Sequence, residues 1–175
     1  MKKLSVLALV LVMTVSTTAD ALADTLGLGV VTNITSSTAA AADMDGAGQV
    51  DTTICTLTVD ENGVITEIEF DIAQTKVTFN AKGEITADLD AEYPTKYEMG
   101  EAYGMKAASS ISKEWFEQVD VLVAFCKGKT LEQVLAGVSE DKSSAVAQDL
   151  KAGATLHLND FIAALEKAYA AATIK

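Results

Sequence analysis

Apolar and polar residues alternate through the first half of the chain. The segment QVDTTICTLTVD (residues 49–60) has a period of two, which is typical of a half-buried strand. Its two sides carry Val50, Thr52, Ile54, Thr56 and Thr58 on one hand, and Thr53, Cys55, Leu57 and Val59 on the other. The β-branched stretch LGLGVVTNIT (residues 26–35) predicts a further strand before it.

Turn residues then predict two hairpins. Asp60-Glu61-Asn62-Gly63 follows the alternating strand, and Asn-Gly supplies the positive φ angles of a tight turn. The segment VITEIEFDI (residues 64–72) returns as its partner strand, with these candidate core residues: Val64, Ile65, Ile68, Phe70 and Ile72. A second turn at residues 81–83 predicts another hairpin, between residues 77–79 and 84–86. Residues 26–88 are therefore expected to form an antiparallel meander.

The period changes to that of a helix in the second half. Residues 109–126 space apolar side chains three to four apart, which predicts an amphipathic helix of about five turns ended by Gly128. Thr130 and Gln133 have the spacing of a capping box and predict a short helix. Asn159 and Asp160 can cap a last helix, which has one apolar stripe: Phe161, Leu165, Ala168 and Ala172. Strands followed by helices indicate an α+β fold, an antiparallel meander sheet with helices packed on one face.

The first residues have the pattern of a secretory signal. Lys2 and Lys3 precede an apolar run over residues 4–15, and Ala21-Leu22-Ala23 resembles a cleavage site. The run is shorter than the roughly 20 apolar residues that cross a membrane. We therefore expect an exported protein with a signal peptide at residues 1–23, a single domain at residues 24–175, and no stable membrane span after cleavage.

Charge narrows the range of partners. The formal net charge of the chain is −12, from 13 basic and 25 acidic residues, and every basic residue is a lysine. Such a surface repels nucleic acid, and it lacks the guanidinium fork that grips phosphate at two points. Nucleic-acid binding is therefore not expected. Cys55 and Cys126 are compatible either with one disulfide in an oxidising compartment or with two buried thiols.

Residues for self-contained catalysis are sparse. His157 is the one histidine of the chain, and it alternates with leucines, which favours a structural role over a catalytic one. Zinc sites and hydrolase triads need several such residues, so no metal site and no catalytic set is predicted. The carboxylates are spread over turns and helix faces, as in an ordinary acidic surface.

A short segment carries a family resemblance. DLKAGAT (residues 149–155), followed by Leu156 and a helix, resembles the flavinylation motif of the FMN-binding domain family. That motif has an aspartate, two variable residues, Ser or Thr, and then Gly-Ala-Thr. Residues 48–71 are similar to the opening hairpin of the family, so that the resemblance covers most of residues 48–172. Members include flavin subunits of sodium-translocating NADH:quinone reductases and exported electron-transfer flavoproteins.

The resemblance implies a cofactor and a set of residues. A flavin transferase would attach FMN to Thr155 through a phosphoester bond and would recognise Asp149. Gly153 would let the backbone approach the phosphate closely, and Ala154 would leave room for the transferase. The chain would then be an extracytoplasmic electron carrier with a membrane redox partner. Ala152 and Lys151 depart from the motif, which favours the alternative, a flavin-free binding or interaction module of the same fold. Tyr103 and Trp115 are aromatic candidates for flavin contact, and both are explained more simply as core residues.

Overall fold

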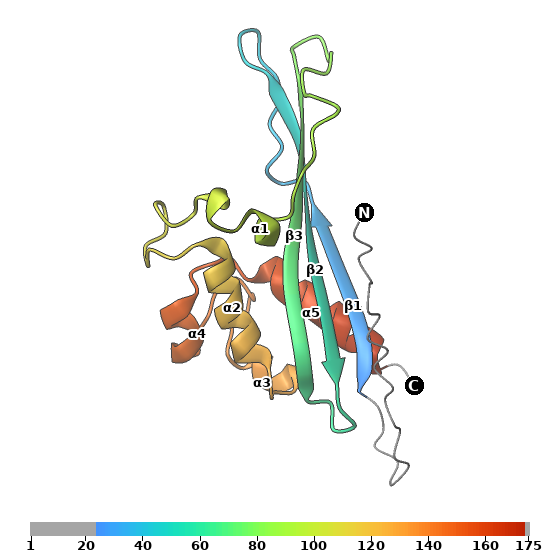
Figure 1. Ribbon diagram of the computed structural model, residues 1–175, viewed down its shortest axis with the longest axis vertical. Coiled ribbons are helices and arrows are strands. Elements are labelled where there is room, and N and C mark those ends of the chain that lie inside the picture. The colour runs from blue at the N-terminus through green and yellow to red at the C-terminus, as the bar shows by residue number, and fades with distance from the viewer. Residues whose placement is uncertain (1–23, 174–175) are drawn as a thin grey trace, which may run out of the picture.

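The computed structural model describes residues 24–173, and it has the α+β fold that the sequence predicts. Its sheet has three antiparallel strands in the order β1-β2-β3 (Figure 1): β1 (Thr25–Asn33), β2 (Gly46–Val59) and β3 (Ile65–Phe79). The predicted signal peptide, residues 1–23, lies outside the described residues.

The helices follow the sheet in the chain. They are α1 (Lys96–Met99), the 3-10 turn η1 (Gly100–Tyr103), α2 (Trp115–Cys126), α3 (Leu131–Leu135), α4 (Gln148–Gly153) and α5 (Asn159–Thr173). Helix α5 runs across one face of the sheet and contacts β1 and β2, whereas α2 lies between β3 and α4 (Figure 1). The beginning of β2 and the end of β3 project beyond the helices (Figure 1).

The two faces of the sheet differ as the alternation predicts. On the covered face, Cys55 lies opposite Phe70 and Leu57 opposite Ile68, and all four are buried. The Phe70 ring meets the Phe161 ring of α5 edge-on, with 5.5 Å between centroids. On the other face, the side chains of β2 are partly exposed. There Thr56 lies opposite Glu69, so this face has a mixed polar surface.

Two glycines of β1 allow α5 to approach the sheet very closely. A Cβ atom on Gly29 would lie 1.9 Å from the carbonyl oxygen of Ala164, and one on Gly27 would lie 1.9 Å from that of Ala168. Both alanines are fully buried. Small residues on both elements thus bring backbone against backbone, because any larger side chain would push the helix away.

The second predicted hairpin is wrong. The turn itself forms, since Gly83 has a φ of 82° and its N–H donates to the carbonyl of Asn80. The return segment makes only an isolated bridge, between Phe79 and Ile85, and no fourth strand. Ile85 is the one apolar residue of this predicted strand and is 57% exposed, so burial does not hold the segment against the sheet.

The start of the first long helix is also wrong. Helix α2 begins at Trp115, not at Ser109, and Ser112 has a φ of 53°, which is incompatible with a helix. Glu114 caps the helix instead, because its side chain and that of Glu117 form a reciprocal capping box. Two other helix signals are confirmed: Gly128 follows the end of α2 with a φ of 77°, and Thr130 caps α3. Asn159 and Asp160, the predicted caps of the last helix, are instead the first two residues of α5, and the Asn159 side chain donates to the carbonyl of Asp141.

The tight turn between β2 and β3 differs in one detail. Gly63 has a φ of 74°, but Asn62 does not adopt a positive φ. The side chain of Asp60 holds the turn in place, since its Oδ1 accepts hydrogen bonds from the N–H groups of Asn62 and Val64. These bonds favour the charged carboxylate, and the one from Val64 contributes most to lowering the pKa of Asp60.

Candidate functional site

The residues of the predicted flavinylation motif lie in and after helix α4. Asp149 is exposed in the first turn of α4, and its Oδ1 accepts a hydrogen bond of 3.0 Å from the N–H of Leu150. Leu150 is fully buried and anchors the helix. Helix α4 is not predicted by the sequence, because its six residues show no apolar stripe. The motif therefore begins on a helix and ends on an irregular segment.

Gly153 is a packing position. A Cβ atom here would lie 2.7 Å from Cγ1 of Val121 in α2 and 2.8 Å from its Cγ2. Ala154 is also buried. The small residues of the motif thus allow α4 to pack against α2, and Val121 occupies the space that a side chain at Gly153 would take.

Thr155 is exposed, and a buried glutamine holds it in place. Oε1 of Gln118 accepts two hydrogen bonds from this residue, 2.9 Å from its backbone N–H and 3.1 Å from its Oγ1. Gln118 lies in α2 and is fully buried. A buried amide that accepts both donors fixes the backbone and the rotamer of Thr155 together.

The amide nitrogen of Gln118 binds the irregular segment before α2. Nε2 donates to Oγ of Ser109 at 3.2 Å and to the carbonyl of Lys113 at 3.2 Å. Gln118 therefore links two segments that carry no regular structure of their own. Sequence reasoning missed it, although a glutamine directly before the apolar stripe position Val119 is a usable signal for a buried amide.

These contacts test whether the motif residues fit an FMN group. Thr155 is an exposed residue with a hydroxyl group, which suits a covalent link. Gly153 does not form a cradle for a phosphate, because Val121 fills the space beside it. The motif residues Asp149, Gly153, Ala154 and Thr155 do not line the groove beside β3 or the small hollow beside His157. They fit FMN as a tether through one bond.

A groove of about 680 Å³ lies on the other side of α2. Consecutive residues of β3, from Glu67 to Asp71, form one wall, and Ile54 and Thr56 of β2 extend it. The opposite wall comes from α1 and α2: Tyr97, Glu98, Asp120, Val123 and Lys127. We call this the β3 groove. Its volume is within the usual range of ligand sites.

Negative charge gathers around Tyr97 in the β3 groove. The hydroxyl of Tyr97 donates a 2.7 Å hydrogen bond to Oδ1 of Asp120. This bond raises the pKa of Tyr97, and burial and the charges of Asp120, Glu69 and Asp71 add to the effect. Asp71 accepts a hydrogen bond from the N–H of Tyr97 at 3.1 Å. The tyrosine is thus held among carboxylates.

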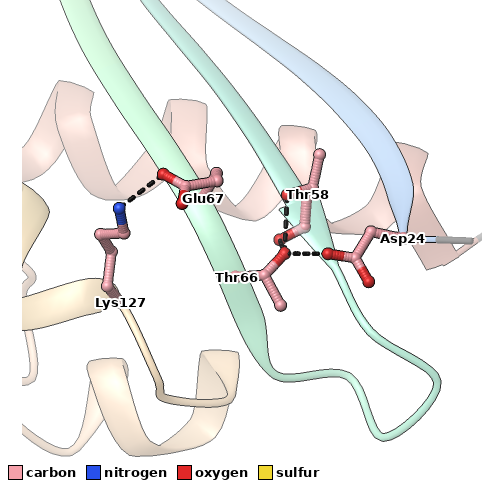
Figure 2. A network of polar contacts seen from close by, with 5 residues as sticks. All are labelled: Asp24, Thr58, Thr66, Glu67 and Lys127. Atoms are coloured by element: carbon pink, nitrogen blue, oxygen red, sulfur yellow. Dashed lines mark hydrogen bonds and ion pairs between the residues drawn. The ribbon is translucent and has the colours of Figure 1, made fainter. Parts of the chain in front are cut away.

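Lys127 lies at one end of the β3 groove and pairs with Glu67. Figure 2 shows this end, with Lys127 reaching from the end of α2 to the carboxylate of Glu67. Beside the pair, the hydroxyl of Thr66 bonds to Thr58 on the neighbouring strand and to Asp24 (Figure 2). Of the residues that line the groove, Lys127 is the one with positive charge, and Glu67 balances it.

Cys55 and Cys126 are free, buried thiols. Burial raises the pKa of both, to about 12 for Cys126, so neither is a thiolate at neutral pH. Of the two interpretations of these cysteines, the structure shows the one with buried thiols. Trp115 is buried as expected, with the rings of Tyr97, Tyr103 and Phe161 around it at centroid distances of 6.2 to 6.4 Å.

A second, smaller hollow lies beside His157. His157 is exposed and, with Asn33, Thr35, Asn159 and Asp160, lines a hollow of about 190 Å³. Within residues 24–173, no group of three or more His, Cys, Asp or Glu residues is placed to hold a metal ion. None of the helices in that range is long and apolar enough to cross a membrane.

Comparisons with known proteins give one relative. The chain is 32% identical over 119 residues to a protein named chlorophenol reductase from Desulfitobacterium hafniense. The match covers 62% of this chain and 36% of that protein, so the chain spans about a third of the length of the curated relative it matches. No family model matches the chain, and no solved structure matches it.

Proposed function

We propose that this chain is an extracytoplasmic electron-transfer protein that carries FMN esterified to Thr155. The observation that carries the proposal is the hydroxyl of the exposed residue Thr155, held by Gln118 at the end of a segment that resembles a flavinylation motif. The similarity to a protein named as a reductase supports a redox role. Asp149, exposed six residues before Thr155, is available for recognition by a flavin transferase.

The hydrogen bonds of Thr155 suit a hydroxyl that is to be modified. Its proton points to Oε1 of Gln118, so the lone pairs of Oγ1 are directed away from the buried amide. After esterification, Oγ1 no longer donates to Gln118. The backbone N–H of Thr155 still donates at 2.9 Å, so the buried oxygen keeps a partner and the segment keeps its anchor.

FMN would supply the one-electron and two-electron chemistry, and the protein would supply its position. Because Thr155 is exposed, a flavin attached there would lie at the surface, within reach of a redox partner. Gln118 limits the motion of the attachment point, and Leu150 holds α4 in the core. Covalent attachment retains the cofactor where no pocket encloses it.

The test is the intact mass of the exported protein, together with in-gel flavin fluorescence after denaturation, from a host that co-expresses a flavin transferase. The expected result is a fluorescent band and a mass increase of one FMN less water. Thr155→Val removes the hydroxyl at nearly constant volume and should abolish both signals. Thr75→Val is the matched control, because Thr75 is exposed on β3, outside the motif, and should keep both signals.

Two outcomes contradict the proposal. One is an unmodified mass for the wild-type protein while a known flavinylated protein in the same host is fully modified. The other is flavin retained on Thr155→Val, which would place the attachment at another residue. Circular dichroism of each variant establishes that the fold is intact before the masses are compared.

A flavin-free interaction module of the same fold is the second candidate. The packing of Gly153 against Val121 favours it, because the glycine then needs no phosphate to explain it. Ala152 and Lys151 are both exposed, so the departures from the motif have no compensating role in the core. An unmodified wild-type mass in the experiment above is the result that this candidate predicts.

A further inference from the structure

The outer edge of β3 is open along the β3 groove. β3 is the last strand of the sheet, and among the described strands it pairs with β2. Ile65 exchanges backbone hydrogen bonds with Gly128 and Lys129, at 2.8 and 2.9 Å. At the other end, Asp71 is tied to Tyr97 through its side chain. Between these points, among the described residues, no backbone hydrogen bond joins residues 66–70 to any segment except β2.

An open edge beside a groove suits an extended chain. The unpaired N–H and C=O groups of an edge strand are a template for another strand. About five residues of β3 are available, which at roughly 3.3 Å per residue is long enough for a short strand. A small molecule is too short to pair with such a row of backbone donors and acceptors. The edge therefore favours a peptide backbone as the occupant.

The side chains of the groove define what that peptide should carry. Val123 of α2 and Ile54 of β2 give apolar lining, and carboxylates surround them: Glu69, Asp71, Glu98 and Asp120. Lys127 is already neutralised by Glu67. Side chains alternate between the two faces of a strand. Ile54 lies opposite Asp71 in the β2–β3 pair, so one set of peptide side chains would meet Ile54 and the carboxylates of the sheet on the same face, and the other set would point to the opposite face.

Charge argues against a second copy of this chain as the occupant. The chain has a net charge of −12, and it is lysine-poor relative to its acidic residues. Two such molecules repel each other, whereas a basic partner is attracted before contact. The partner that fits is therefore basic where it touches the groove.

We propose that the β3 groove binds an extended segment of a partner protein in which lysine or arginine alternates with apolar residues. The segment adds to the open edge of β3 as a fourth strand, and its basic side chains pair with Glu69, Asp71 and Asp120. This site does not depend on the modification of Thr155. Asp120, Val123 and Lys127 lie on the side of α2 opposite to Gln118, since residues of a helix turn by about 100° each.

The test uses a labelled peptide of alternating lysine and valine, about seven residues long with both ends blocked, and measures fluorescence anisotropy at low ionic strength. Wild-type protein should bind it with a saturable curve. Glu69→Lys should weaken binding roughly tenfold, and the neutral variant Glu69→Gln less than that. Glu140→Lys is the matched control, because Glu140 is exposed outside the groove and the change in net charge is the same. It should weaken binding by less than about threefold.

Two further measurements separate a strand from a diffuse charge effect. Hydrogen exchange should slow at alternate backbone amides within residues 67–71 when the peptide binds, because the amides that point away from β2 gain acceptors. A peptide with the same side chains but alternate backbone nitrogens methylated should bind at least tenfold more weakly, because it has lost its donors.

Three results would overturn the proposal. Equal weakening by Glu69→Lys and Glu140→Lys would show non-specific attraction to an acidic surface. Equal binding of the methylated peptide would show recognition of cationic side chains without strand pairing. No binding by the wild-type protein, in a sample whose thermal unfolding is cooperative, would exclude the peptide class. Unmodified protein serves throughout, so failure here is distinguishable from failure at Thr155.

Discussion

The two sides of helix α2 differ in how their polar groups are satisfied. On the side that faces α4, Gln118 is fully buried, and both ends of its amide are hydrogen-bonded inside the protein. On the side that faces β3, Asp120 is exposed and accepts a hydrogen bond from the hydroxyl of Tyr97, in a groove that is open to solvent. The polar groups on one side of α2 are thus fully satisfied inside the protein, whereas those on the other side are accessible to a partner molecule.

This difference separates a positioning role from a recognition role. A buried amide with fixed partners tolerates little change, so the Thr155 segment that it holds is a rigid platform. Exposed carboxylates cost little to rearrange, and they retain capacity for new hydrogen bonds. Four variants test the contrast, beginning with the one of largest expected effect.

Replacement of Gln118 by leucine should be the most damaging. Gln118→Leu keeps the bulk of the side chain but leaves the N–H of Thr155 and the segment before α2 without their partner. We expect a loss of about 2–4 kcal/mol in the free energy of unfolding. Urea unfolding measures it, with Gln148→Leu at an exposed position as the control, which should stay within about 0.5 kcal/mol of wild type. An unchanged midpoint for Gln118→Leu would remove the basis for a rigid platform.

Alanine at Gly153 should cost less. Gly153→Ala forces a Cβ atom to within 2.7 Å of Val121, and overpacking of this kind costs about 1–3 kcal/mol, reduced by the better helix propensity of alanine. Val121→Ala makes room for the added Cβ atom. Gly153→Ala should therefore cost much less stability in the Val121→Ala background than in the wild-type protein. A double-mutant cycle in urea measures the coupling. Zero coupling would mean that Gly153 is not explained by packing, which would strengthen its assignment to a phosphate.

The ionisation of Tyr97 tests the charge cluster in the β3 groove. Its pKa is raised in the folded state by the hydrogen bond to Asp120, by burial and by nearby carboxylates. A raised pKa means that its contribution to stability is present in full below the unfolded value of 10.0 and is lost as the pH rises through the folded pKa. Asp120→Asn should lower the pKa of Tyr97, as measured by tyrosinate absorbance or NMR of the ring. A titration unaffected by Asp120→Asn would contradict the charge cluster.

Lys127 should matter least for stability. Lys127→Met breaks the exposed pair with Glu67, and such pairs contribute less than about 1 kcal/mol. The same change removes the positive charge from the β3 groove and frees Glu67, so the affinity for the basic peptide should rise about twofold or more. Thermal unfolding and anisotropy measure the two effects on one sample. A weaker affinity would indicate that the lysine itself contacts the occupant.

Local patterns predicted much of the fold. The alternation in β2 identified the covered face, since Cys55, Leu57 and Val59 are all buried. The stripe of α5 and the capping box of Thr130 were also identified. These features depend on neighbours within a few residues, which a sequence displays directly.

The errors have a common cause. Residues 84–86 follow a good turn, but a strand also needs a buried face, and Ile85 alone does not provide one. Ser109 and Ile111 continue the spacing of α2, but Glu114 begins the helix by capping it. In the candidate site, Thr155 was named from its motif, whereas Gln118 and Val121 were not, since nothing local marks them as its neighbours.

Sequence by itself determined the three strands of the sheet, the helices α2, α3 and α5 that follow them, the buried faces of β2 and α5, and the residues whose types resemble a flavin attachment motif. Tertiary structure alone decided that Gln118 holds Thr155 across 37 positions of the chain and that Val121 fills the space at Gly153. It also decided that β3 lies at an open edge beside Asp120. The physical reason is range: periodicity and capping act between close neighbours, but contacts between distant segments exist only once the whole core has packed.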